Sequence, residues 1–445
     1  MNLLNNFTKI KFKTMNKLIL LLFVFVSFWS CQSKYPGVPE SYHVLLDSAF
    51  VKAGKNVAEI QKALNETPKE QKEGMAFIIS YMPKRDLTTL SAAFLLENSE
   101  YAYKAREKYK WCAALPDTVF FNEVLPYANI SETRDPWRKD FFERFSKYVD
   151  DKDNIVDAIF AIARPINKEV NVEYNTNRSK VDSSPKEAMD EKMATCTGLS
   201  IILTDAFRSV GIPSRLAGTA MWTNFKGNHT WSEVWVDNQW QFIEYYPDTL
   251  NKSWFLADAG KADPNNMLHW IYATSYKPTG LPYYAGVSSN DILDVIDLNS
   301  LPDPMKVRFE RMKSRSGERK KEETYIWGVN VTERYIDLYQ ESLINNKLNE
   351  DELMANFVVF NNEDTAKSES RIDCRVDIYE GENIVDFGYS PRKTDDMNLF
   401  LKIKLKKERK YEVVVSSPAE NITQTFDIQT GNDSTDEFKL VLKNN

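Results

Sequence analysis

Residues 195–215 read TCTGLSIILTDAFRSVGIPSR, and this stretch decides the fold of the middle of the chain. Glycine and proline at positions 211 and 213 end the helical pattern that precedes them. The sequence therefore predicts a helix over residues 195–210 that begins at Cys196. The apolar residues that recur three and four apart form one stripe of this helix, namely Leu199, Ile202, Leu203, Ala206 and Phe207.

Strand-like segments follow this helix. Residues 214–219 begin a strand, residues 229–237 alternate between two faces, and residues 240–246 return after a turn at Asp237-Asn238. Upstream, Ser184-Pro185-Lys186-Glu187 has the proline and acid that favour a helix start. A helix followed by an antiparallel hairpin indicates an α+β fold.

The two ends of the chain have different patterns. Helical spacing, broken at Pro68 and Pro83, predicts a helical N-terminal region over residues 35–114. A highly charged stretch predicts a linker over residues 286–324. Alternating stretches separated by turn residues predict a C-terminal β-sandwich over residues 325–445. Its expected strands are Val329–Leu338, Ile372–Tyr379, Leu399–Lys406, Lys410–Val415 and Phe438–Leu442.

Composition excludes some functions. The chain has 445 residues, a net charge of −7 and interspersed basic and acidic residues, so it has no electrostatic footprint for nucleic acid. No glycine-rich phosphate loop is present, so we expect no nucleotide cofactor. No His, Cys and Asp cluster has zinc-ligand spacing, and no acidic loop is of the calcium-binding type, so we expect no metal and no cofactor.

The N-terminal residues are typical of an export signal. Lysines at 9, 11, 13 and 17 precede the apolar run Leu18–Phe28, which is too short to span a bilayer. The run ends in Ser27-Phe28-Trp29-Ser30-Cys31, which resembles the looser lipobox of Bacteroidetes lipoproteins. We therefore expect residues 1–31 to be a lipoprotein signal peptide that ends at a lipidated Cys31. The protein would then be exported, periplasmic or associated with the outer membrane, and in contact with the membrane only through lipid. An ordinary cleaved signal, a short buried helix and a start at Met15 are the alternatives.

The remaining cysteines are Cys112, Cys196 and Cys374, an odd number of which one stays free. A Cys112–Cys374 disulfide is left open. Cys196 stands at a predicted helix start, where the helix dipole and the free backbone N–H groups favour a thiolate. The same N–H groups can bind an oxyanion.

A thiol nucleophile also needs a base and a group that orients the base. The chain has only three histidines, at 43, 229 and 269, and His229 opens the predicted strand that follows the cysteine helix. Pairing across the hairpin makes Glu244 a near neighbour of His229. The sequence therefore predicts a Cys–His–carboxylate site of Cys196, His229 and Glu244, with Asp248 as the second choice for the carboxylate.

These three segments together resemble a known family. Residues 195–215 resemble the cysteine helix of transglutaminase-like domains, which are related to papain; Asn228–Trp235 resembles the histidine strand and Trp240–Glu244 the third element. The resemblance is strongest over residues 184–258 and implies a transglutaminase-like core over residues 115–285. It implies Cys196 as nucleophile, His229 as general acid/base and Glu244 as orienting carboxylate. The sequence departs from the family pattern at Ala194, commonly glycine, and at Glu244, most often aspartate.

Flanking stretches resemble exported transglutaminase-like proteins of Bacteroidetes, among them Trp254-Phe255 and Asn330–Tyr335. Three aromatic residues are candidates for substrate binding: Trp222 in the loop before His229, and Tyr127 and Trp137 farther upstream. For each of them packing is the alternative. We expect Trp231, Trp235 and His269 to be structural.

The leading hypothesis is an exported, lipid-anchored thiol enzyme that hydrolyses amide bonds or transfers their acyl groups. Its substrate would be a protein, peptide or glycopeptide, without nucleic acid. The alternative is a non-catalytic surface lipoprotein that uses the same fold as a binding or assembly scaffold. A third possibility is glycan processing, since peptide N-glycanases share this core. The sequence does not predict the oligomeric state.

Overall fold

The computed structural model describes residues 33–175, 177–224, 227–247, 249–283, 306–307, 310, 326–345, 347–365, 370–393, 400–417 and 422–443. Cys31 and the predicted signal peptide, Asp248, and most of the predicted linker lie outside the described residues. The chain divides into two compact units on either side of the Leu96–Glu97 bond.

The first unit is helical, because short apolar-faced helices bury a common core. Its buried residues include Leu46, Ile60 and Ile79, none of which is exposed. In the described part of the chain, no helix is long and apolar enough to cross a membrane. The helices that begin in this unit are η1 (Glu40–Tyr42), α2 (His43–Ala53), η2 (Gly54–Asn56), α3 (Val57–Glu66), η3 (Lys69–Gln71), α4 (Lys72–Tyr81), α5 (Lys84–Thr89) and α6 (Ala92–Lys108).

The second unit contains a five-stranded antiparallel sheet with strand order β5-β4-β3-β6-β7, which we call the core sheet. Its strands are β3 (Ser214–Thr219), β4 (His229–Val236), β5 (Gln239–Ile243), β6 (Ile271–Ser275) and β7 (Trp327–Asn330). A separate parallel pair, β1 (Glu173–Tyr174) and β2 (Met193–Ala194), precedes the cysteine helix.

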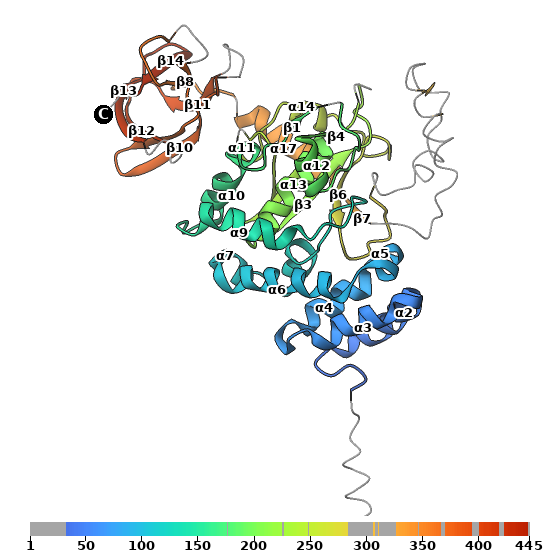
Figure 1. The fold of residues 1–445 in the computed structure, drawn as a ribbon. Coiled ribbons are helices and arrows are strands. Elements are labelled where there is room, and N and C mark those ends of the chain that lie inside the picture. The colour runs from blue at the N-terminus through green and yellow to red at the C-terminus, as the bar shows by residue number, and fades with distance from the viewer. Residues whose placement is uncertain are drawn as a thin grey trace, which may run out of the picture. The chain divides into compact units, whose positions relative to one another are not determined.

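Helices cover both faces of the core sheet (Figure 1). Helix α13 (Cys196–Ser209) packs on β3 and β4, with hydrogen bonds to Thr230 and Ser232. Side chains alternate along a strand, so Trp231 and Glu233 of β4 face the other way, where they contact Tyr335. The remaining helices of this unit are α7 (Lys110–Ala113), α8 (Asp117–Val119), η4 (Phe120–Val124), α9 (Trp137–Val149), α10 (Ile155–Ala163), α11 (Ile166–Val170), α12 (Pro185–Glu191), α14 (Leu256–Ala259) and α17 (Thr332–Asn345).

The C-terminal strands form two sheets, of strand order β10-β9-β12-β13 and β11-β8-β14. Residues from both sheets bury one common core that includes Phe357, Val413 and Ile403, so the two sheets form a sandwich. The strands are β8 (Glu352–Phe360), β9 (Arg375–Glu380), β10 (Asn383–Tyr389), β11 (Leu401–Lys406), β12 (Lys410–Ser417), β13 (Ile422–Gln429) and β14 (Thr435–Val441).

The α+β class is confirmed, and several local predictions agree with the structure. Helix α13, strand β4 and its return as β5 lie where the sequence places them, and Asp237 and Asn238 both have the positive φ of a tight hairpin turn. Helix α12 begins with a capping box in which Ser184 and Glu187 satisfy each other's backbone N–H groups.

The predicted strand Val329–Leu338 is wrong beyond Asn330. Residues 332–345 form α17, in which Tyr335, Leu338 and Tyr339 recur at helical spacing and pack against the aromatic cluster of the core sheet. Strand β7 pairs with β6 of the core sheet, so the sandwich strands begin at β8.

Candidate active site

Cys196 is the first residue of α13, and the local sequence fixes this helix start. The Thr195 side chain accepts a hydrogen bond from the Gly198 N–H at 3.1 Å, which caps the helix. A Cβ atom at Gly198 would lie 2.9 Å from the Cβ of Ala194, so only glycine allows β2 and the helix start to approach this closely. Cys196 is partly exposed, whereas Cys112 and Cys374 are buried, and none of these three cysteines forms a disulfide.

His229 is the first residue of β4, and hydrogen bonds hold this strand end against the helix start. The hydroxyls of Thr197 and Thr230 lie 3.1 Å apart, and Ser200 Oγ donates to the carbonyl oxygens of Cys196 and Thr230. The chain thus places a histidine next to the cysteine although the two are separated by a helix, a strand and a loop. The Cys196 thiol and the His229 imidazole are hydrogen bonded.

Glu244 follows β5 and completes the chain of hydrogen bonds. Ser232 pairs with Ile243, so Glu244 stands one step farther on, opposite Trp231 and diagonal to His229. A diagonal partner is more distant than a direct one, and the extra methylene of glutamate spans that distance. Glu244 Oε1 lies 2.7 Å from His229 Nε2, which leaves Nδ1 of the imidazole for the thiol.

Ser253 is a residue that the sequence does not single out. Its hydroxyl donates to Glu244 Oε2, so both carboxylate oxygens have a partner. A serine in a loop carries no sequence signal for such a role, because the contact depends on how the loop after β5 folds back. Asp248, the second choice for the carboxylate, lies in none of the described ranges.

The electrostatics of the cysteine and histidine favour an ion pair. Burial raises the pKa of the Cys196 thiol, but the hydrogen bond and charge of His229 outweigh it, and the net pKa is lower than the usual 9.0. Burial lowers the pKa of His229, but its bonds to Cys196 and Glu244 raise the pKa to about 9. The two groups titrate as one coupled pair, which loses its protons in two steps. At a pH between these two steps the thiolate and the imidazolium coexist.

Aromatic rings surround the histidine. The His229 ring centroid lies 5.6 Å from Trp231, 5.2 Å from Phe255 and 5.0 Å from Trp254. Trp222 stacks on Trp231 at 6.1 Å. Phe255 and Trp231 are fully buried, so they hold the imidazole from beneath, whereas Trp254 is 66% exposed.

The three residues predicted to bind substrate are buried. Trp222, Tyr127 and Trp137 are 4%, 2% and 6% exposed, respectively. Trp137 Nε1 donates to the carbonyl oxygen of Tyr127, and Arg138 donates to the three preceding carbonyls of this loop, from Val124 to Pro126. In this structure the three aromatic residues pack in the interior, and their contact with a substrate stays a prediction.

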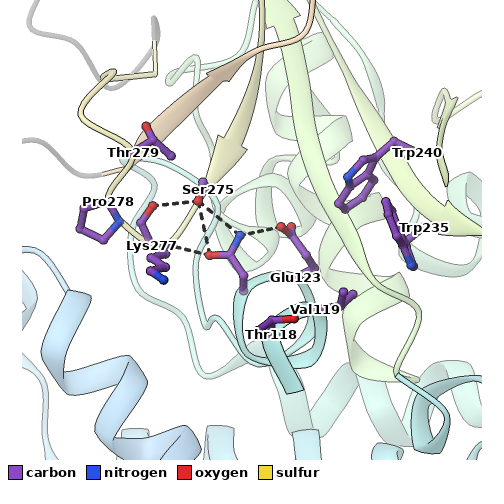
Figure 2. Close-up of a pocket in the computed structure, with 10 residues that line it drawn as sticks. Thr118, Val119, Glu123, Trp235, Trp240, Ser275, Lys277, Pro278 and Thr279 are labelled. Carbon is purple, nitrogen blue, oxygen red and sulfur yellow. Dashed lines mark hydrogen bonds between the residues drawn. The ribbon is translucent and has the colours of Figure 1, made fainter. Parts of the chain in front are cut away.

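The structure also has a pocket with a volume of about 270 Å³, which the Cys196 thiol does not line (Figure 2). Trp235 lines this pocket and lies on the same strand, β4, as His229. At about 3.3 Å per residue, the two residues are separated by roughly 20 Å along the strand. The Asn122 side chain links its parts, since it donates to Glu123 and Ser275 and accepts from the Lys277 N–H. This pocket is therefore separate from the Cys196 site.

Within the described residues, no group of three His, Cys, Asp or Glu side chains could hold a metal ion.

Three comparisons with known proteins describe what the chain is similar to. Residues 143–245 match the family model described as the transglutaminase-like superfamily, and this stretch contains Cys196, His229 and Glu244. No curated protein sequence matches the chain. One matching solved structure is a protein of Cytophaga hutchinsonii that is described as a candidate cysteine protease, with 20% identity and a TM-score of 0.22. The match covers 24% of this chain and 37% of that protein, so this chain spans little more than a third of its length.

Proposed function

We propose, from the transglutaminase-like core at residues 143–245, that this protein is a thiol enzyme acting on amide bonds. The observation that carries the proposal is the hydrogen-bonded series Cys196, His229 and Glu244, with the thiol at a helix start. A nucleophile, a base and a group that orients the base, all within hydrogen-bond reach, are the requirements of covalent catalysis.

The first half of the proposed reaction forms a thioester. The Cys196 thiolate attacks the carbonyl carbon of the amide, a C–S bond forms, and the carbonyl electron pair moves to the oxygen. The backbone N–H of Cys196, at the first helical position, has no acceptor within its own helix and is available to this oxyanion. The electron pair of the oxyanion then re-forms the C=O bond, and the C–N bond breaks as His229 Nδ1–H gives its proton to the leaving nitrogen. The amine departs and the thioester remains.

The second half returns the enzyme to its resting state. Neutral His229 takes a proton from water, the water oxygen bonds to the thioester carbon, and the C–S bond breaks. The products are a carboxylic acid and the restored thiolate–imidazolium pair. An amine in place of water gives a new amide by the same steps, so the proposal covers hydrolysis and acyl transfer. Glu244 keeps the imidazole oriented throughout through its hydrogen bond to Nε2.

The experiment follows the thioester directly. The full chain is mixed with N-acetylglycine methyl thioester, and the intact mass is recorded over time. The proposal expects an acetylglycyl adduct on Cys196 in the wild type, no adduct in Cys196→Ser and strongly slowed formation in His229→Ala. Cys374→Ala serves as the matched control, because Cys374 is buried in the sandwich core, and should behave as the wild type.

The rival proposal, a non-catalytic scaffold, predicts a different outcome. If the fold acts only as a binding surface, no adduct forms at Cys196, and Cys196→Ser keeps whatever binding the wild type has. Adduct formation that is equal in the wild type and His229→Ala would also contradict the enzyme proposal. In that case the thiol reacts without help from the histidine.

A further inference from the structure

Trp254 is a large apolar side chain that this fold leaves in water. It is 66% exposed, whereas Trp222 and Trp231 in the same aromatic cluster are 4% and 0% exposed. A buried indole stabilises a fold, so a tryptophan that stays mostly exposed does not contribute this stabilisation. A scattered exposed apolar residue needs no explanation, but this one lies with its ring 5.0 Å from the His229 imidazole.

The position of Trp254 is fixed relative to the reacting groups. The preceding residue, Ser253, donates to the carboxylate of Glu244, which in turn binds His229. The following residue, Phe255, is fully buried and packs edge-on against the Trp254 ring at 5.9 Å. The indole is thus held from both sides along the chain and is ready to receive a partner without rearranging.

Further exposed apolar residues border the cysteine. Tyr174 is 56% exposed, and its strand β1 pairs it with Ala194, two residues before Cys196. Val181 is 55% exposed, and its carbonyl oxygen accepts a hydrogen bond from the Thr195 hydroxyl at 2.6 Å. Exposed apolar side chains thus come from segments next to the cysteine as well as from Trp254 beside the imidazole.

We infer that Trp254 binds the part of the substrate that carries the leaving amine, and that this part has a bulky apolar side chain, preferably aromatic. The inference rests on the proposed function, because His229 protonates the leaving nitrogen in that reaction. A residue in contact with the imidazole lies beside the leaving group rather than beside the distal acyl chain. The substrate class is then a polypeptide with an aromatic or large aliphatic residue immediately after the reacting carbonyl.

The same site serves the acceptor when the reaction runs in reverse. An amine that attacks the thioester loses a proton to His229 as its nitrogen bonds to the carbonyl carbon and the C–S bond breaks. By microscopic reversibility this amine occupies the position of the leaving amine. The preference for aromatic amines is therefore measurable even if hydrolysis is the natural reaction.

The test divides one thioester between two amines. The acetylglycyl adduct is formed from N-acetylglycine methyl thioester, and equal amounts of phenylalanine amide and glycine amide compete to accept it. We expect the wild type to favour phenylalanine amide by about tenfold, which equals about 1.4 kcal/mol and is reasonable for one aromatic contact. Trp254→Ala should reduce the preference to near unity, and Trp254→Phe should keep most of it.

Controls separate the two proposals. Val51→Ala, which removes an apolar side chain of α2 that is 81% exposed, should leave the preference unchanged. The acetylglycyl adduct should still form in Trp254→Ala, because Cys196, His229 and Glu244 are unaltered, and its formation shows that the variant keeps the reacting groups. If the adduct forms but the wild type shows no preference, or Trp254→Ala keeps it, the inference fails and the proposed function stands. If no adduct forms in the wild type, both fail.

Discussion

At the scale of single residues, the partners of His229 decide what the site can do. The imidazole is bonded to Cys196 on one side and to Glu244 on the other, and both bonds raise its pKa, to about 9. A general acid works only while it is protonated. The account therefore predicts that acyl transfer stays fast up to about pH 9 and declines above it, as the imidazolium loses its proton. At low pH the rate declines because the thiolate becomes a thiol.

Glu244→Gln tests this assignment. Glutamine keeps a hydrogen bond but removes the negative charge that raises the His229 pKa, so the imidazolium loses its proton at lower pH. We expect the alkaline limit of the pH–rate profile to move down from about pH 9 and the maximal rate to fall by about tenfold or more. An unchanged alkaline limit would show that another carboxylate, such as Asp248, orients the ring. Glu244→Asp is the matched control, since it keeps the charge but shortens the reach.

Ser253→Ala tests a positioning residue. The substitution removes the donor to Glu244 Oε2 and lets the carboxylate rotate away from His229. We expect kcat to fall by about tenfold, since a hydrogen bond to a charged group contributes about 1.5–3 kcal/mol, with little change in KM. Ser253→Thr should restore the rate, because it keeps the hydroxyl. A loss confined to protein stability, with kcat unchanged, would contradict the positioning role.

At the scale of elements, the turn after α13 sets the spacing between helix and sheet. Gly211 has φ +74°, and a Cβ atom there would lie 2.5 Å from the Cβ of Cys112. Gly280 has a similar φ of +84°, but no atom lies within 4 Å of a Cβ built there. The two glycines thus share the backbone requirement and differ in packing.

Gly211→Ala and Gly280→Ala form a matched pair. We expect Gly280→Ala to destabilise the protein by about 1 kcal/mol, from backbone strain alone. Gly211→Ala should lose a further ~1–3 kcal/mol, because the added methyl overpacks the contact with Cys112. Chemical denaturation of both variants measures the difference. Equal losses of stability in the two variants would contradict this prediction, because they would show that Cys112 moves aside without a free-energy cost.

The sequence predicts the elements whose patterns are local. The apolar stripe of α13, the alternation of β4 and the Asp237-Asn238 turn are each contained in a few consecutive residues. The sequence does not predict helix α17, because Val329–Leu338 contains the end of a short strand and the first turns of a helix. Only the packing of Tyr335 on Trp231 and Phe242 distinguishes the helix from a strand. The sequence also does not predict the roles proposed for Ser253 and Trp254, because each role depends on a tertiary contact.

At the scale of the whole molecule, the export signal remains a proposal from the sequence. Cys31 is expected to carry lipid and to attach the protein to a membrane, although it lies outside the described residues. We expect Cys31→Ser to abolish incorporation of labelled fatty acid and to shift the protein from the membrane to the soluble fraction. Cys112→Ser is the control that should keep both. Membrane association of Cys31→Ser equal to that of the wild type would contradict the anchor.

The most direct measurement is the pH dependence of alkylation at Cys196. The wild-type chain and His229→Ala are treated with iodoacetamide across a range of pH, and the Cys196 peptide is quantified by mass spectrometry. The account predicts a wild-type midpoint below 9.0, because His229 lowers the pKa of the thiol. In His229→Ala the midpoint should rise above 9.0, because burial then acts unopposed. A wild-type midpoint at or above 9.0, or one that His229→Ala leaves unchanged, would contradict the claim that His229 activates Cys196.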